Sequence, residues 1–308
     1  MYITDDQVSR YYYPDKDITD RRNYFLVEDG DGNYYWEDLT IESEDSRASA
    51  QDVTFYLYTL QNPNNPEVIP ATNFPALVNS AVFSTARQNV FVTHGWNNNF
   101  LSNVNVQIRT ALLNWHNVNI FIVDWSRPAN LFYTSARNAV PEIGNAVGDF
   151  INTMISSFGL SPARFDLVGH SLGAHVSGCA GARVNGLVNS IVGLDPAGPL
   201  FTIGNIDNRI DPTDGDFVQI IHTNDGLLGF SGQLGHADYS PNGGSSQPGC
   251  GIDLAGTCAH SRAFLFYAES LGNNALVARQ CASHSNFNNG LCNNNHRSLM
   301  GGLNVDKR

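Results

Sequence analysis

The sequence predicts an α/β fold in which a mostly parallel sheet is covered by helices on both faces. Short runs of Val, Ile and Phe alternate along the chain with longer segments of helical periodicity. Several of the short runs are almost continuously apolar, which is typical of strands buried on both faces of a sheet. With 308 residues, 42% hydrophobic and 15% charged, the chain can fill the core of one large domain and is too poor in charge to be disordered.

The strands and helices are predicted from this alternation. Six segments rich in β-branched and aromatic residues are predicted as strands: Val53–Leu60, Val90–Thr93, Ile120–Val123, Phe165–Val168, Ile191–Leu194 and Val218–Ile221. Helical spacing predicts four helices: Leu101–His116, Ser135–Phe158, Leu172–Val184 and Ser261–Leu271. Proline lacks an amide hydrogen, so we expect Pro141 near a helix start or a kink. No apolar run reaches the roughly 18 residues of a membrane helix, so we expect no transmembrane segment.

The first fifty residues differ from the rest of the chain. They hold 13 acidic and 5 basic side chains, a net charge of −8 out of a total of −12. Tyr24–Val27 and Tyr34–Trp36 flank the Asp-Gly turn at residues 29–32, which predicts a β-hairpin. Glu42–Gln51 is polar and is predicted to be a linker. We therefore divide the chain into an acidic N-terminal extension and a main domain that starts at residue 51.

This extension, residues 1–50, has two interpretations. The sequence Ser46-Arg47-Ala48 in the polar linker predicts a site for a trypsin-like protease, so the extension would be a removable pro-segment of the domain 51–308. Alternatively, the hairpin is permanent and packs on the sheet edge, where it would bury the aromatic residues 34–36.

The charged residues indicate which partners to expect and at which pH the protein works. The chain has a net charge of −12 and no visible cluster of basic residues that could bind phosphates, so we expect no nucleic-acid partner. Of the 17 basic residues, 15 are arginine, and only Lys16 and Lys307 are lysine. Lysine loses its charge near pH 10.4, whereas arginine keeps it beyond pH 12. This composition fits a protein that works in alkaline surroundings.

A candidate nucleophile stands in the sequence Gly169-His170-Ser171-Leu172-Gly173. It follows a predicted strand and opens a predicted helix, which is the context of the nucleophile elbow in the α/β-hydrolase fold. The two glycines allow the tight turn that exposes the serine at the carboxyl end of the sheet. We therefore predict that Ser171 is the nucleophile.

A serine hydroxyl needs a base and an orienting carboxylate, which follow in the order Ser, Asp, His in this fold. Asp195 directly follows the predicted strand that ends at Leu194 and is the preferred carboxylate. Asp211 and Asp214 in a Pro/Thr turn, and Asp253 between two cysteines, are rivals that are more typical of turn or surface residues.

Five histidines follow Asp195 and are candidates for the base: His222, His236, His260, His284 and His296. We prefer His260, because a loop tethered by a cysteine just before an apolar helix can hold an imidazole still. We expect structural roles for His222 and His236. We expect His284 and His296 to be solvated, because they lie in an Asn-rich tail. His175 is expected to be a packing residue.

Acyl transfer also needs hydrogen-bond donors for the oxyanion. The amide that follows the nucleophile, that of Leu172, is the first candidate. The second is the amide of Trp96 in His94-Gly95-Trp96, where glycine lets the backbone approach the ester. We expect His94 to brace this loop.

Seven stretches together resemble the catalytic domain of the animal pancreatic-lipase family, and most closely that of insect midgut lipases. They are His94–Trp96, Val123–Trp125, Gly169–His175, Gly193–Gly198, Val218–Thr223, Tyr239–Gly244 and Cys258–Arg262. The resemblance implies the α/β-hydrolase fold, a lipid substrate, a Ser171–Asp195–His260 triad, and oxyanion amides at Trp96 and Leu172.

The sequence departs from the family pattern in three places. It ends where the family's catalytic domain ends, so we expect no C-terminal lipid-binding β-sandwich and no colipase partner. The lid is shortened to the seven residues between Cys250 and Cys258, and the loop from His222 to His236 is also short, as in phospholipases A1. The family's calcium loop corresponds to Asp207–Asp214 and keeps Arg209, Asp211 and Asp214, but Ile206 takes the place of an acidic ligand, with Asp207 adjacent. We therefore expect no metal or other cofactor.

The resemblance also implies the disulfides Cys250–Cys258 and Cys281–Cys292, and it leaves Cys179 as a buried thiol. Two disulfides indicate an oxidising setting, so we expect a secreted, extracellular protein, with the gut lumen as one setting that fits. The implied function is a serine carboxylic ester hydrolase that cleaves acyl lipids, with polar lipids or triacylglycerol as substrate. The alternative is a catalytically silent lipid-binding or yolk-type storage protein on the same domain.

Overall fold

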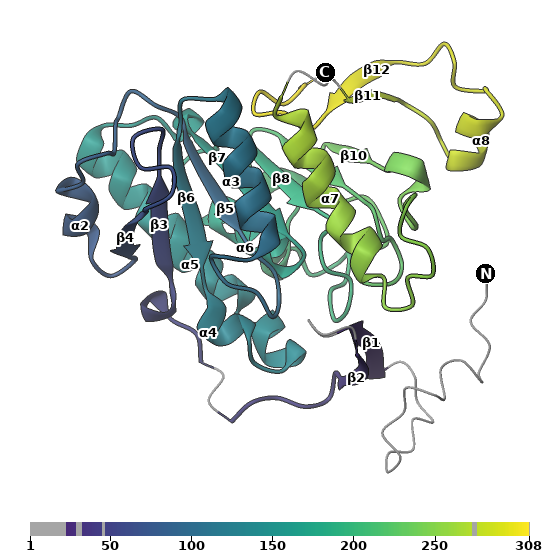
Figure 1. Ribbon diagram of the computed structural model, residues 1–308, viewed down its shortest axis with the longest axis horizontal. Helices are drawn as coiled ribbons and strands as arrows, with labels where there is room; N and C mark the ends of the chain where they lie inside the picture. The colour runs from purple at the N-terminus through teal and green to yellow at the C-terminus, as the bar shows by residue number, and fades with distance from the viewer. Residues whose placement is uncertain (1–22, 29–32, 45–46, 273–275, 308) are drawn as a thin grey trace.

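A computed structural model describes residues 23–28, 33–44, 47–272 and 276–307 (Figure 1). Its centre is an eight-stranded sheet with the order β10-β9-β8-β7-β5-β6-β3-β4. The strands are β3 (Thr54–Tyr58), β4 (Glu67–Pro70), β5 (Asn89–Thr93), β6 (Asn119–Asp124), β7 (Phe165–His170), β8 (Ser190–Leu194), β9 (Val218–Ile221) and β10 (Ala237–Tyr239). Strands β5 to β10 are parallel, whereas β3 pairs antiparallel with β4 and β6. This arrangement confirms the predicted α/β fold.

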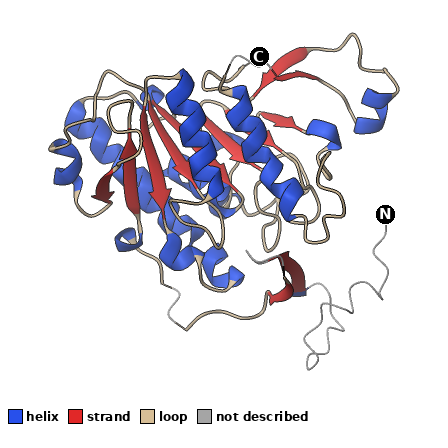
Figure 2. Cartoon of the chain, viewed as in Figure 1, coloured by secondary structure: helices blue, strands red, loops and turns tan. Residues whose placement is uncertain are grey.

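Helices cover both faces of the sheet (Figure 2). Helices α3 (Asn103–Trp115) and α7 (Thr257–Ser270) pack together on one face, and α5 (Tyr133–Phe158) and α6 (Leu172–Arg183) on the other. Because apolar side chains cover both faces, the central strands are buried throughout, as their continuous apolar runs predicted. The short helices are α2 (Phe74–Val78), α4 (Ser126–Ala129) and α8 (His284–Asn288).

The predicted helix boundaries need two corrections. Pro141 lies inside α5, which begins eight residues earlier, at Tyr133. Helix α7 begins at Thr257, so His260 lies in its first turn and not in a preceding loop. The cause is a cap that the sequence pattern did not show. The carboxylate of Asp253 accepts hydrogen bonds from the amides of residues 258 and 259, at 3.2 and 2.7 Å, which starts the helix early.

The predicted N-terminal hairpin is present as a separate two-stranded sheet of β1 (Tyr24–Glu28) and β2 (Tyr34–Asp38); its turn lies outside the described residues. The expected position on the sheet edge is wrong, because β4 and β10 form the two edges and the hairpin contacts the start of α5 instead. The aromatic residues 34–36 are only half-buried, whereas Leu26 and Glu37 are buried. Ser46 of the proposed cleavage site lies outside the described residues, and cleavage there stays a prediction.

The cysteines pair as expected. Disulfides join Cys250 to Cys258 and Cys281 to Cys292, and the latter lies beside a second hairpin of β11 (Leu276–Arg279) and β12 (Arg297–Met300). Cys179 is a buried free thiol, and burial raises its pKa to about 12, so it is not a reactive nucleophile. In the described part of the chain, every helix is too short or too polar to span a bilayer.

Candidate active site

Ser171 lies in the sharp turn between β7 and α6, with φ 58° and ψ −125°. Serine rarely adopts a positive φ, and the neighbouring glycines make the turn sterically allowed. A Cβ atom on Gly169 would lie 2.0 Å from the carbonyl oxygen of Gly173, and one on Gly173 would lie 2.4 Å from that of His94. Glycine is therefore required at both positions of the G-x-S-x-G motif, because the backbone passes too close for a side chain. The turn places Ser171 at the carboxyl end of the sheet.

Asp195 follows the neighbouring strand at the same level. The register of β7 and β8 pairs His170 with Leu194, so the residues after them leave the sheet side by side. Asp195 is fully buried, and its Oδ1 accepts hydrogen bonds from the amides of Thr223 (2.8 Å) and Asn224 (3.0 Å). These two donors satisfy this oxygen in its buried position.

His260 completes this group from α7. Its Nδ1 donates to Oδ2 of Asp195 at 2.5 Å. An imidazole that carries its proton on Nδ1 leaves Nε2 free to accept another proton, which is the form that a general base needs. The structure thus joins the predicted carboxylate to the predicted base, next to the turn that carries Ser171.

A second histidine supports His260. Nε2 of His170 donates to the backbone carbonyl of His260 at 3.1 Å, and the two ring centroids are 4.4 Å apart. Burial, with His260 nearby, lowers the pKa of His170 well below its ordinary value, so this side chain is neutral. His170 was not among the predicted site residues, although it directly precedes Ser171. Since His170 is adjacent to Ser171, its bond ties the backbone of the base to the nucleophile turn.

Two backbone amides lie beside the nucleophile. Leu172 is the first residue of α6, and Trp96 follows Gly95 after β5. A Cβ atom on Gly95 would lie only 2.8 Å from Cβ of Ser171, so the oxyanion loop, which we define as residues 94–97, touches the nucleophile turn. Within the described residues, neither amide donates to another protein group. Both are therefore available to an oxyanion.

Two other histidines near the site have bracing roles, as expected. Nδ1 of His94 donates to the carbonyl of Gly95 at 2.9 Å, and its Nε2 accepts from the amide of Trp125 at 3.3 Å. Nε2 of His175 donates to the carbonyl of Ala197 at 2.8 Å, while its Nδ1 accepts from the amide of Ile210. Burial lowers the pKa of His175 to about 3, so it stays neutral.

The rival candidates for the orienting carboxylate and for the base have other hydrogen-bond partners or are exposed. Asp253 caps α7, and the two carboxylates of the turn at 211–214 cap a short helix, η6 (Pro212–Asp214). His222 donates to Asp238 at 2.8 Å, and Nδ1 of His236 accepts from the amide of Val218. His284 and His296 are exposed.

The side chains that correspond to the family's calcium loop form hydrogen bonds within their own segment. Oδ1 of Asp211 accepts from the amide and hydroxyl of Thr213, at 2.7 and 2.6 Å, and Oδ2 of Asp214 accepts from the amide of Asp211 at 2.8 Å. The buried guanidinium of Arg209 donates to the carbonyls of residues 202, 203 and 210. These side chains thus bond to groups within their own segment, and the expected absence of calcium stays a prediction.

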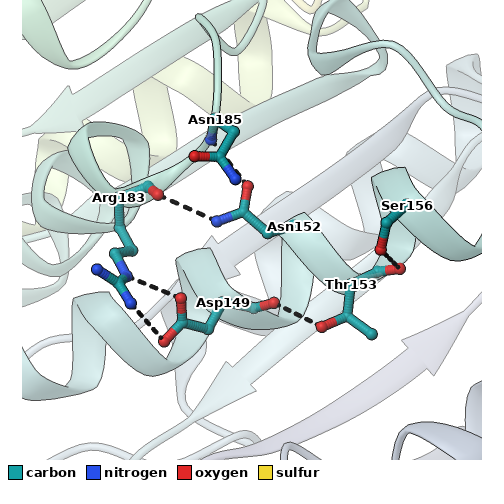
Figure 3. A pocket seen from close by; sticks show the side chains of 6 residues that line it. All are labelled: Asp149, Asn152, Thr153, Ser156, Arg183 and Asn185. Carbon is teal, nitrogen blue, oxygen red and sulfur yellow. Dashed lines mark hydrogen bonds and ion pairs between the residues drawn. The ribbon is translucent and has the colours of Figure 1, made fainter.

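A polar hollow lies on the outer face of α5 and the end of α6 (Figure 3). It is lined by Asp149, Asn152, Thr153, Ser156, Arg183 and Asn185. Arg183 pairs with Asp149 at 2.7 Å, and Asn152 donates to the carbonyl of Arg183 at 3.1 Å. Arg183 is at the far end of α6 from Ser171, about 18 Å away at the usual helical rise. This hollow is therefore separate from the candidate catalytic group.

The geometry agrees with comparisons to known proteins. A family model described as Lipase matches residues 27–307. Pancreatic triacylglycerol lipase from Myocastor coypus is 33% identical over 267 residues, which are 79% of this chain and 58% of the relative. The chain belongs to the pancreatic lipase family. The human pancreatic triacylglycerol lipase is 34% identical over 269 residues, which are 79% of this chain and 57% of the relative.

Not all relatives of this lipase-family chain are active. The inactive pancreatic lipase-related protein 1 from Canis lupus familiaris is 35% identical over 261 residues, which are 77% of this chain and 56% of the relative. The chain thus spans less than two thirds of the length of these curated relatives. Among solved structures, an esterase from Thermogutta terrifontis aligns with 70% of this chain and 87% of its own, at a TM-score of 0.38 and 13% identity. The family and the sheet topology together identify the α/β-hydrolase fold.

Proposed function

We propose that this protein is a serine ester hydrolase that cleaves acyl lipids with Ser171, Asp195 and His260 as its triad. The observation that carries the proposal is the 2.5 Å bond from Nδ1 of His260 to buried Asp195, next to a nucleophile elbow. The free amides of Trp96 and Leu172 beside that elbow support it.

Each group then has a role in a two-step reaction. Oγ of Ser171 attacks the ester carbonyl, while Nε2 of His260 takes the hydroxyl proton and delivers it to the leaving alcohol. Asp195 holds the imidazole tautomer and stabilises the cation that forms. The oxyanion of each tetrahedral intermediate accepts hydrogen bonds from the two amides. A water molecule, activated by the same base, then releases the fatty acid from the acyl-enzyme.

The loops around the site favour polar lipids as substrates. Gly256, just before α7, lies against Leu227, since a Cβ atom there would be 2.8 Å from Cδ2 of that residue. The short loop closed by Cys250–Cys258 and the loop after β9 therefore meet beside His260. Neither is long enough to form a large apolar flap, and Ser171 remains partly exposed. We propose that the site admits the bulky head groups of phospholipids or galactolipids, with hydrolysis at the sn-1 ester.

Exposed apolar side chains on these two loops suit a lipid surface. Ile252 in the disulfide loop is 77% exposed, and Leu227 is 45% exposed. Such side chains can enter the interfacial layer of a membrane or micelle without closing the site. The two disulfides favour an extracellular location. We propose that the enzyme acts outside the cell on lipid aggregates.

A lipid panel tests this function. Phosphatidylcholine, a galactolipid and triolein are presented as matched mixed micelles to the wild type and to Ser171→Ala, and released fatty acid is measured. We expect hydrolysis of the polar lipids, weak interfacial activation, and loss of all activity in Ser171→Ala. Hydrolysis of triolein alone, with a large rate increase at the interface, would contradict the proposed substrate class. Lipid binding without hydrolysis would favour a silent binding protein.

A further inference from the structure

The N-terminal hairpin contacts the oxyanion loop through an aromatic cluster. The ring of Phe25, on β1, lies 5.8 Å from that of Trp96 and 5.0 Å from that of Tyr133, measured between centroids. Trp96 and Tyr133 are themselves in edge contact at 5.4 Å. All three rings thus touch one another, and such edge-on pairs fix relative positions as well as burying area. A residue from the N-terminal extension is therefore in direct contact with the residue that supplies an oxyanion amide.

The hairpin is also fixed to the start of α5. Oε1 of buried Glu37 accepts a hydrogen bond from the amide of Tyr133 at 2.8 Å, which satisfies one of the unpaired amides at this helix end. Past the hairpin, the carbonyl of Leu39 accepts from Thr134 at 2.9 Å, and the amide of Ser43 donates to Ser135 at 2.7 Å. Successive residues of the extension therefore bond to the first turn of α5.

These contacts are placed to control the oxyanion loop. The indole of Trp96 donates to the carbonyl of Leu131 at 2.8 Å, so it bridges this loop and the segment before α5. The ring of Phe25 packs against Trp96 at one end of this bridge. It also packs against Tyr133, two residues after Leu131 at the other end. On its other side, Gly95 touches the nucleophile turn. A shift of the Trp96 ring would consequently move its backbone amide relative to Ser171.

The contacts described above reach Trp96 and α5, while Ser171 keeps part of its surface open to solvent. This is the pattern of a support for the site and not of a cover that blocks it. The family match beginning at residue 27 includes β2, which agrees with the hairpin being part of the shared domain.

We propose that the hairpin of β1 and β2 is a permanent part of the domain, and that two of its residues, Phe25 and Glu37, are positioning residues for the oxyanion amide of Trp96. This inference rests on the proposed function. It differs from the pro-segment interpretation, because removal of the hairpin would lower activity rather than release it.

The test compares full-length variants on a soluble short-chain ester, which avoids effects of lipid interfaces. Phe25→Ala is expected to lower kcat about tenfold and to change KM less than about twofold, since a displaced donor weakens only the transition state. An alkyl boronate, which forms a tetrahedral adduct with the serine, should bind about tenfold more weakly. Tyr24→Ala is the matched control, because it removes a ring from the opposite face of the same strand and should leave these values unchanged.

Conservative variants separate positioning from general stability. Phe25→Leu keeps the apolar volume and should retain more kcat than Phe25→Ala, which also provides a folded variant if the alanine protein fails to fold. Glu37→Gln keeps an acceptor for the amide of Tyr133 and should retain more kcat than Glu37→Ala. The urea midpoint of each variant shows whether a loss of kcat exceeds the loss of folded protein.

The outcomes distinguish this inference from the proposed function. An active wild type with Phe25 variants of unchanged kcat and boronate affinity would overturn the positioning role alone. A rise in activity on trypsin cleavage after Arg47 and release of the hairpin would also overturn it, in favour of a pro-segment. A wild type that neither hydrolyses esters nor binds the boronate would instead overturn the proposed function.

Discussion

His170 and His260 are joined by a hydrogen bond from the imidazole Nε2 of the first to the backbone carbonyl of the second, at 3.1 Å. The bond connects the residue before the nucleophile to the residue proposed as base, although 90 positions separate them in the sequence. The ring of Phe264 packs edge-on against His170 from α7, at 5.3 Å between centroids. The nucleophile turn and the first turns of α7 are therefore held as one unit.

Replacement of His170 should impair catalysis more than binding. His170→Ala removes the donor, and we expect kcat to fall about tenfold with little change in KM, because proton transfer depends on the position of the imidazole. His170→Gln places an amide donor near the position of Nε2 and should recover part of the loss. Steady-state kinetics on a soluble ester measure this. Equal losses in both variants would show that the hydrogen bond is not the cause.

Asp195→Asn should nearly abolish activity while the fold persists. An amide in this position no longer favours the imidazole tautomer with its proton on Nδ1, and loss of that carboxylate in serine hydrolases lowers kcat by about four orders of magnitude. The rival carboxylate supplies the control. Asp253→Asn should keep most activity and lose about 1 kcal/mol of stability, because the amide retains only one of the two oxygens that accept from the start of α7. The reverse ranking of the two variants in kcat would assign the orienting carboxylate to Asp253.

Stability should be maintained to about pH 9 and should fall above pH 10. Burial raises the pKa of Tyr133 and of Tyr267 above the ordinary value of 10.0. Above pH 10 the unfolded chain loses these protons while the folded chain keeps them, so rising pH favours unfolding. Each such tyrosine contributes a loss of about 1.4 kcal/mol per pH unit.

Urea unfolding between pH 8 and 11 measures this effect, with near-UV circular dichroism as a check on the fold. Tyr267→Phe removes one titrating hydroxyl, so its stability should fall less steeply above pH 10 than that of the wild type. Identical slopes for the two proteins, or loss of the near-UV signal by pH 9, would contradict the prediction.

Chelation should leave the enzyme active. In the segment between β8 and β9, the carboxylates of Asp211 and Asp214 accept local hydrogen bonds, and the guanidinium of Arg209 donates to backbone carbonyls. We therefore expect kcat and the urea midpoint to be unchanged after dialysis against EDTA. Loss of activity that calcium restores, and magnesium does not, would show that this segment rearranges to bind the ion.

Much of the fold follows from local patterns in the sequence. Strands such as β5 and β6 contain continuous apolar runs because both faces of the sheet are covered, and this pattern needs no tertiary information. The nucleophile turn was predictable because its glycines are required by backbone contacts. Asp195 was found by the rule that site residues follow strands at their carboxyl ends.

Other features depend on contacts between distant segments. Strand β10 has only three residues, and its sequence Ala-Asp-Tyr carries no strand pattern, so it exists through its pairing with β9. The early start of α7 depends on the Asp253 cap. The place of the hairpin beside Trp96 and α5 is set by Phe25 and Glu37, which lie about 70 and 95 positions from their partners. Local sequence patterns do not encode such contacts.

The most direct measurement is covalent labelling of the full-length protein with a fluorophosphonate probe. This probe reacts with a serine only when a base activates the hydroxyl and amides stabilise the oxyanion. We predict that the wild type is labelled stoichiometrically at Ser171, that Ser171→Ala is not labelled, and that Asp195→Asn is labelled far more slowly. A folded wild type that takes up no label, or equal labelling of Ser171→Ala, would contradict a catalytic triad at this site.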